Sequence, residues 1–395
     1  MRLAKRMDLL GTESAFEVLA RAKRLEADGR SIVHLEIGEP DFATPAHIVA
    51  AAEAAIEDGY THYTPAGGIP EVRDTVAQHY SRRLGIECQG NEVILTPGSK
   101  NILMFALLAL IEPGDEVILP DPGYPIYASL VSFMGATPVG VPLREERGFR
   151  FDVEEFKSLV TDRTRMVILN SPQNPTGGIL ERDDLVEVAK IAVERDLWVV
   201  SDEIYSQIAY DGPVPSIAEL PGMKERTILM DGLSKAYAMC GWRLGIGLAP
   251  AELIRHMETL MINSSSCATA FIQVATMTAL ESPESEKSIL RMVDEYRRRR
   301  DVLVDGLNTI PGIRCHRPGG AFYVFPNVEA TGWDHKMLAD ALLAKAGVAV
   351  LPGTAFGSMG RGYIRLSYAQ SVDNLTEGLS RIGEFLGDPA NQVTG

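Results

Sequence analysis

The chain has 395 residues, of which 46% are hydrophobic and 23% are charged, a composition typical of a folded globular protein and not of a disordered one. The formal net charge of −15 argues against nucleic-acid binding, and the basic run at residues 297–300 stands among acidic residues, as on a solvated helix face. A single hydrophobic core stops growing at about 250–300 residues, so the length predicts two lobes.

The chain offers few signals for a membrane, a disulfide or a metal. Its longest apolar stretch, residues 102–111, is too short to span a bilayer. The basic first residues have no apolar segment behind them, which argues against a secretory signal. The four cysteines are scattered and share no CxxC spacing. We therefore expect a cytoplasmic protein with reduced thiols, no membrane attachment and no metal.

The first three quarters of the chain predict an α/β fold. Residues 7–29 have a helical pattern. Short apolar runs then predict strands at 92–96, 116–119, 166–170, 197–201, 227–230 and 243–248, and helical patterns at 100–111 and 183–195 lie between them. Near-continuous apolar strands separated by helices indicate a mostly parallel sheet covered by helices on both faces.

The last quarter predicts a different arrangement. Residues 282–307 read as a long, charged, amphipathic helix that separates two lobes. Strands are predicted at 320–325 and 363–367, and helices at 337–346 and 372–386. We therefore expect a large domain over residues 44–282 and a smaller α+β domain built from residues 1–43 and 283–395.

Polar residues follow five consecutive predicted strands, at the place where open parallel sheets bind ligands. The segments are TPGSK at 96–100, PDPGYP at 120–125, SPQNPTGG at 171–178, DEIY at 202–205 and DGLSK at 231–235. Each has an ordinary interpretation, since Ser99 could be a helix cap, Asp202 a turn residue and Lys235 a surface lysine. Their order and spacing together are far more specific than any one of them.

These motifs carry a resemblance that covers nearly the whole chain. NPTG at 174–177, SDEIY at 201–205, SK and GWRLG within 234–245 and IRLSY at 364–368 follow IGEPDF at 37–42 and YTPAGG at 63–68. The chain resembles the fold-type I pyridoxal-phosphate-dependent aminotransferases of class I and II, the family of aspartate aminotransferase. The resemblance implies pyridoxal 5′-phosphate as cofactor. It also implies transfer of the α-amino group of an L-amino acid, aspartate-like or another common one, to a 2-oxo acid such as 2-oxoglutarate.

The resemblance also implies a role for each matching residue around the cofactor ring. Lys235 matches the lysine that forms the internal aldimine and later carries the proton. Asp202 matches the carboxylate that keeps the pyridine nitrogen protonated. Tyr205 and Asn174 match residues that reach the ring 3′-oxygen, and Tyr124 matches the residue that stacks on the ring.

Further matches concern the cofactor phosphate and the substrate. The phosphate contacts would come from Ser99, Lys100, Ser234 and Arg243, and from Tyr63 of the other subunit, which implies a homodimer with shared active sites. Arg365 matches the arginine that holds the substrate α-carboxylate, with Gly38 as a backbone contact at the same end. Tyr124 and Asn174 would also face the substrate.

Two positions depart from the pattern of many relatives or have more than one interpretation. Gly232 stands where many relatives have a phosphate-binding serine, for which Ser234 could compensate. Lys100 has two interpretations. It could approach the distal carboxylate of an acidic substrate, or lie at the cofactor phosphate as in LL-diaminopimelate aminotransferases. An LL-diaminopimelate-type aminotransferase and a pyridoxal-phosphate-dependent β-lyase are therefore the alternative functions. Side-chain specificity is expected to depend on Lys100 and on residues 11–16 and 263–273.

Overall fold

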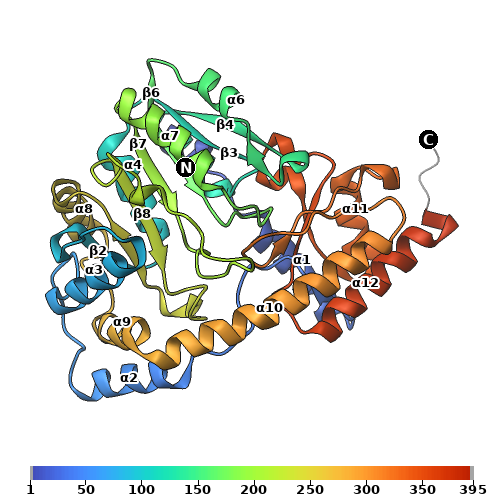
Figure 1. Ribbon diagram of the computed structural model, residues 1–395. Coiled ribbons are helices and arrows are strands. Elements are labelled where there is room, and N and C mark those ends of the chain that lie inside the picture. The colour runs from blue at the N-terminus through green and yellow to red at the C-terminus, as the bar shows by residue number, and fades with distance from the viewer. Residues whose placement is uncertain (1–2, 392–395) are drawn as a thin grey trace.

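Eight strands form a central sheet in the computed structural model, which describes residues 3–391 (Figure 1). The strand order is β2-β9-β8-β7-β6-β3-β4-β5. Neighbouring strands from β8 to β4 are parallel, whereas β9 is antiparallel to both β2 and β8, and β5 is antiparallel to β4. The predicted mostly parallel sheet is therefore confirmed. The strands are β2 Val93–Thr96, β3 Glu116–Asp121, β4 Thr137–Arg144, β5 Arg150–Phe151, β6 Thr164–Asn170, β7 Trp198–Asp202, β8 Thr227–Gly232 and β9 Gly245–Leu248.

Helices cover this sheet, and its central strands are apolar on both faces. Along β6, Val167 and Leu169 join one buried cluster, while Met166 and Ile168 join another. Successive side chains of a strand point to opposite faces, so a strand between two helical layers needs a continuous apolar run. The helices in this part of the chain are α2 Ala46–Glu57, α3 Pro70–Leu84, α4 Lys100–Leu110, α5 Pro125–Phe133, α6 Val153–Leu159, α7 Arg182–Glu194, α8 Ala251–Ser264 and α9 Ala270–Glu281.

The two ends of the chain build a second structure together. Strands β10 (Tyr323–Val324) and β12 (Leu351–Pro352) pair antiparallel with β13 (Ile364–Ser367). Strand β1 (Val33–His34) pairs in parallel with β11 (Val348–Ala349), so an early segment joins a late one. The helices around these strands are α1 Ser14–Ala27, α11 His335–Ala341 and α12 Val372–Gly387.

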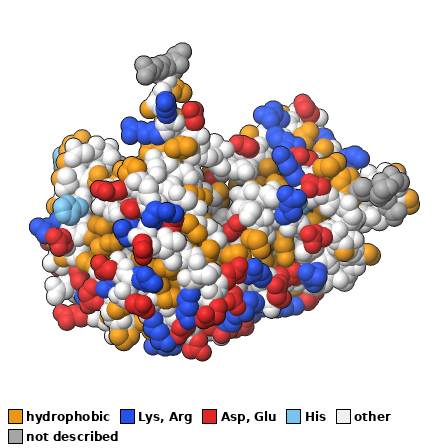
Figure 2. Space-filling model, turned by 90° about the horizontal axis from the view of Figure 1, so that it is seen from above, with side chains coloured by type: hydrophobic (Ala, Val, Ile, Leu, Met, Phe, Trp, Pro, Cys, Tyr) orange, Lys and Arg blue, Asp and Glu red, His pale blue; other side chains and the backbone are white. Residues whose placement is uncertain are grey.

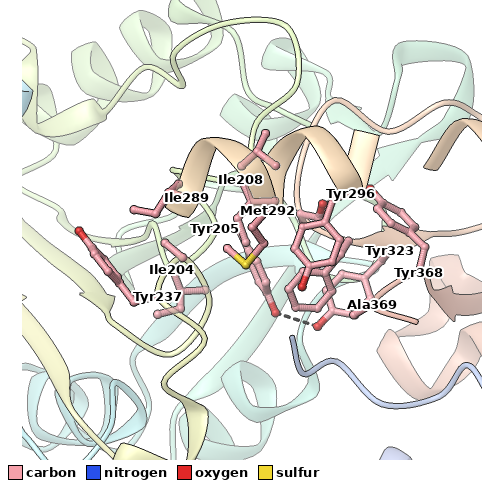
Figure 3. Close-up of a cluster of buried hydrophobic side chains, with 14 of the residues drawn as sticks. Ile204, Tyr205, Ile208, Tyr237, Ile289, Met292, Tyr296, Tyr323, Tyr368 and Ala369 are labelled. Atoms are coloured by element: carbon pink, nitrogen blue, oxygen red, sulfur yellow. Dashed lines mark hydrogen bonds between the residues drawn. The ribbon is translucent and has the colours of Figure 1, made fainter. Parts of the chain in front are cut away.

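Helix α10 (Pro283–Thr309) connects the two regions and runs from α9 to α12 (Figure 1). Its start is fixed by Ser282, whose side chain accepts a hydrogen bond from the backbone of Glu284, and by Pro283 in the first turn. A cluster of buried aromatic side chains packs along this helix (Figure 3). Tyr205 follows β7, Tyr323 lies on β10, and Tyr296 lies on α10 itself. The core is thus continuous from the central sheet to the smaller sheet.

Among the differences between the structure and the sequence prediction, one concerns strand β4 and another the N-terminal helix. Strand β4 was not predicted, because two prolines and Gly140 interrupt its apolar pattern. A Cβ at Gly140 would lie 3.0 Å from Cβ of Asp121, so a larger residue there would require Asp121 to shift by a few tenths of an ångström. The single N-terminal helix expected at residues 7–29 is instead a short 3-10 helix, Lys5–Leu9, and α1, with Gly11 between them.

The surface shows no segregation of charge on the face drawn in Figure 2. Lys and Arg side chains alternate there with Asp and Glu side chains. Within residues 3–391, no helix is both long enough and apolar enough to cross a bilayer.

Candidate functional site

A cavity of about 400 Å³ opens at the carboxyl ends of the central parallel strands. Asn170 ends β6 and Asp202 ends β7, while Lys235 follows β8 by three residues. The N-terminal segment and β13 close the cavity from the other side, through Glu13 and Arg365. Its volume is within the range of small-molecule sites, about 300–1,000 Å³.

Asp202 is a buried carboxylate without a cationic partner. Its side chain is 4% exposed; Oδ2 accepts a 2.5 Å hydrogen bond from the hydroxyl of Tyr127, and Oδ1 accepts a 3.2 Å bond from the backbone of Ile204. Burial raises the pKa of Asp202 to about 7, with a further contribution from the nearby carboxylates of Asp231 and Glu203. Among the described residues it forms no ion pair, so a cationic ligand group would stabilise its charged form.

The neighbouring carboxylates, by contrast, are paired with an arginine from α3. Arg83 donates to Glu203 at 2.8 Å and to Asp231 at 2.9 Å. The hydroxyl of Tyr80, one helical turn away, donates to the same oxygen of Asp231 at 2.8 Å. This network fixes α3 against the ends of β7 and β8, and it leaves Asp202 as the unpaired acid of the group.

Lys235 lines the cavity and forms no ion pair with any carboxylate in the described part of the chain. Nζ donates a 2.5 Å hydrogen bond to the carbonyl oxygen of Gly38 and lies 3.7 Å from Sγ of Cys240. It also lies 5.9 Å and 5.7 Å from the ring centroids of Tyr205 and Phe322. An amine held by a carbonyl and aromatic faces is available as a nucleophile once a proton is removed.

Arg365 is a buried guanidinium without an anionic partner among the described residues. It is 4% exposed, donates to Oδ1 of Asn174 at 3.1 Å and donates to the carbonyl oxygen of Glu36. Its guanidinium lies 4.5 Å and 4.9 Å from the ring centroids of Tyr323 and Phe356, and its Nε has no hydrogen-bond partner. Burial lowers the pKa of Arg365 from its ordinary value. The arrangement is suited to a carboxylate ligand, which would offset the desolvation of the cation.

In a third part of the cavity, the backbone around Gly98 lies close to the guanidinium of Arg243. Gly98 has φ +86°, and a Cβ there would lie 2.3 Å from an Nη of Arg243. A Cβ at Gly245 would lie 2.4 Å from the backbone nitrogen of Ser99, immediately before α4. Both glycines therefore keep Arg243 and the helix N-terminus in close approach. A helix N-terminus beside an arginine is a favourable site for a phosphate.

Comparison with known proteins identifies the family. The family model described as "Aminotransferase class I and II" matches residues 30–382. The chain belongs to this family of aminotransferases. It is 41% identical to an aspartate aminotransferase of Pyrococcus horikoshii over 97% of both chains. It is 40% identical to an arginine–pyruvate transaminase of Pseudomonas aeruginosa over 93% of both.

A solved structure supports the same assignment. The aspartate aminotransferase of Thermus thermophilus with maleate superposes with a TM-score of 0.93 at 38% identity, over 97% of this chain and 100% of the other. The family is pyridoxal-phosphate-dependent, and the chain is an aminotransferase with the fold-type I architecture.

In this aminotransferase, most residues predicted from the sequence line the one cavity. They are Gly38, Ser99, Lys100, Tyr124, Asn174, Asp202, Tyr205, Ser234, Lys235, Arg243 and Arg365. Tyr63 does not line it and is 89% exposed. Lys100 contacts the carboxylate of Glu13, a partner that neither interpretation of this lysine included. The chemical roles of these residues stay predictions.

The sequence did not point to several other residues of the cavity. Tyr127 follows Tyr124 by three residues on the first turn of α5, and this helical spacing could have indicated it. Tyr323 donates or accepts a 2.8 Å hydrogen bond with the hydroxyl of Tyr205 (Figure 3). Its hydroxyl lies so near Gly38 that a Cβ there would come within 1.9 Å. Glu13 lies in the segment expected to influence specificity, but nothing singled it out.

Proposed function

We propose that this aminotransferase uses pyridoxal 5′-phosphate to move the α-amino group of an L-amino acid to a 2-oxo acid, in two half-reactions at one site. The proposal rests on two buried charged groups of the cavity that form no ion pair with the described residues. Within residues 3–391, the buried carboxylate of Asp202 has no cationic partner and the buried guanidinium of Arg365 has no anionic partner. A protonated pyridine ring and a substrate α-carboxylate would supply both, beside the amine of Lys235.

The residues of the cavity fit this cofactor. Asp202 would hold the ring nitrogen in its protonated form, and Tyr124 would lie against the ring. Tyr205 and Asn174 would contact the ring oxygen. The phosphate would be held by the side chains of Ser99, Ser234 and Arg243 and by the backbone of residues 98–100, where two glycines permit the close approach. When bound, the cofactor supplies an electron sink for the charge that develops at the substrate Cα.

The chain's own residues would perform the remaining steps. Arg365 would bind the α-carboxylate and thereby orient the Cα–H bond. Lys235 Nζ would remove the proton from Cα as a general base and return it as a general acid. Gly38, whose carbonyl oxygen accepts a hydrogen bond from this amine, would help to position it.

We further propose that two subunits share the active sites. Tyr63 is 89% exposed in the single chain, which is unusual for a tyrosine and is consistent with contact with a partner's cofactor phosphate. We also propose the division into a large domain, 44–282, and a small domain, 1–43 with 283–395. Each region has a sheet of its own, and α10 connects them.

We also propose which amino donor and which acceptor the enzyme uses. Relatives of similar identity are named for aspartate and for arginine with pyruvate, so family membership does not single out one side chain. An aspartate-like or another common donor with an acceptor such as 2-oxoglutarate is therefore our proposal.

The decisive experiment mixes purified, cofactor-loaded protein with a panel of L-amino acids and follows the absorbance of the bound cofactor. We expect at least one donor to change the spectrum, and a 2-oxo acid to restore it. If no donor changes it, the proposal is wrong. Release of pyruvate and ammonia from cystathionine without any 2-oxo acid would instead indicate a β-lyase.

A further inference from the structure

Glu13 places a carboxylate in the cavity wall from the N-terminal segment. It is the residue immediately before α1, and its side chain is 17% exposed. Its Oε1 accepts two hydrogen bonds, one from Nζ of Lys100 and a 2.8 Å bond from the hydroxyl of Tyr124. Lys100 starts α4 and Tyr124 precedes α5, so three separate segments meet at this one oxygen.

The carboxylate lies on the side of the cavity where a substrate would bind. Glu13 and Arg365 both line the main cavity, and both also line a small cavity that adjoins it. Arg365 is the proposed site for the α-carboxylate, and Tyr124 is the proposed neighbour of the cofactor ring. A group near both is placed to meet the substrate side chain.

The other side chains of this wall are mostly apolar. The wall includes Ala15, Phe16, Ile37 and Ile126. The charges of Glu13 and Lys100 offset one another, so this end of the cavity carries no net charge from the pair. A dicarboxylic substrate would bring a second carboxylate next to Glu13, and repulsion between the two carboxylates would oppose its binding to Lys100.

We infer that the Glu13–Lys100 pair determines side-chain specificity, and that, between the two kinds of donor proposed above, it favours common amino acids with uncharged side chains over aspartate-like, dicarboxylic ones. The inference rests on the proposed function, because it concerns substrates of that same reaction. Lys100, which alone would attract an acidic side chain, already has its counter-charge within the chain. Glu13 thus occupies the place that a substrate's distal carboxylate would take.

The test compares the first half-reaction of aspartate with that of leucine, as a ratio of kcat/KM, in cofactor-loaded enzyme. The wild type is expected to favour leucine. Glu13→Gln should raise the aspartate-to-leucine ratio about tenfold, because it removes a like charge and frees Lys100. Lys100→Gln should lower the ratio, because it leaves Glu13 without its cation.

Glu39→Gln is the matched control, since Glu39 lines the same cavity and has no described contact with Lys100. If Glu39→Gln raises the aspartate-to-leucine ratio as much as Glu13→Gln does, the ratio responds to the loss of any negative charge from the cavity, and the inference is wrong. A ratio that Glu13→Gln leaves unchanged or lowers also overturns it.

A binding measurement gives a readout that does not depend on turnover. Titration calorimetry of the loaded enzyme with succinate and with 4-methylpentanoate should show that Glu13→Gln strengthens binding of succinate about tenfold relative to 4-methylpentanoate. The two proposals fail in different ways. If leucine and all other donors are inert with wild-type enzyme, the proposed function fails. If leucine reacts and the ratio does not move, only the role of Glu13 fails.

Discussion

The hydroxyl of Tyr127 donates a 2.5 Å hydrogen bond to Oδ2 of Asp202, and both side chains are buried. The bond partly offsets the desolvation of the carboxylate, since it favours the charged form and lowers the pKa of Asp202 relative to burial alone. Tyr127 therefore acts on the site through Asp202, as a positioning residue.

Tyr127→Phe should raise the pKa of Asp202 above about 7, because the carboxylate loses its side-chain donor. In the proposed mechanism cofactor affinity depends on the charged form of Asp202, so the increase of affinity with rising pH should occur at higher pH in the variant. The dissociation constant of the cofactor, measured from about pH 5 to 9, tests this. Tyr80→Phe removes the corresponding hydroxyl from Asp231 and is the control. Identical shifts in the two variants would exclude a specific role for Tyr127.

Asp202→Asn should change the pH dependence of stability in cofactor-free protein. The folded-state pKa of about 7 lies above the ordinary value of 3.8, so the native state binds the proton more tightly than the unfolded state does. The contribution of Asp202 to the free energy of unfolding is therefore largest below about pH 4 and is lost as the pH rises to about 7.

The asparagine variant has no such loss. At about pH 8 its free energy of unfolding should therefore exceed that of the wild type by up to ~4 kcal/mol, and at about pH 4 this difference should vanish. Urea unfolding at both pH values measures the free energy of unfolding of each protein. Asp183→Asn, at an exposed position on α7, is the control and should show little difference. Parallel pH curves for wild type and Asp202→Asn would contradict the prediction.

Lys235→Ala should abolish the absorbance of covalently bound cofactor and reduce turnover by at least about a thousandfold, because the proposed mechanism makes the amine both the attachment point and the proton carrier. The fold should persist, since the described hydrogen bonds of this amine are to Gly38 and Cys240. Absorbance, turnover and circular dichroism together test this. Lys190→Ala on the exposed side of α7 is the control. Wild-type turnover in Lys235→Ala would refute the assignment.

Arg365→Lys should lower kcat/KM about a hundredfold for every α-amino acid and affect KM and kcat together, because a lysine cannot hold the carboxylate with two parallel hydrogen bonds. An amine without a carboxylate separates this effect from a general structural one. The ratio of L-phenylalanine to 2-phenylethylamine should fall in the variant. If kcat/KM falls equally for both substrates, Arg365 does not bind the carboxylate.

Much of the fold followed from the sequence, because helices on both faces of a sheet require the continuous apolar runs seen at β6 and β7. The strand order did not follow, nor did β4, whose prolines and Gly140 conceal it.

For the site, residues in motifs at strand ends were predicted, because parallel strands bring their carboxyl ends together. Contacts between distant segments were not. Glu13 and Lys100 are separated by 87 positions, and Tyr205 and Tyr323 by 118. No local pattern encodes such pairs, and the raised pKa of Asp202 depends on burial that only the folded chain provides.

The pairing of β1 with β11 has a consequence for how the protein folds during its synthesis. Val33 pairs with Val348, so the first strand lacks its described partner until residue 348 has been synthesised. At about 5–20 residues per second, this delay lasts roughly 15–60 s. During that time the early segment that carries Glu13 has to stay soluble without its native neighbours. The central sheet can form first, and the lining of its cavity is then completed by Arg365 on β13, which is synthesised later.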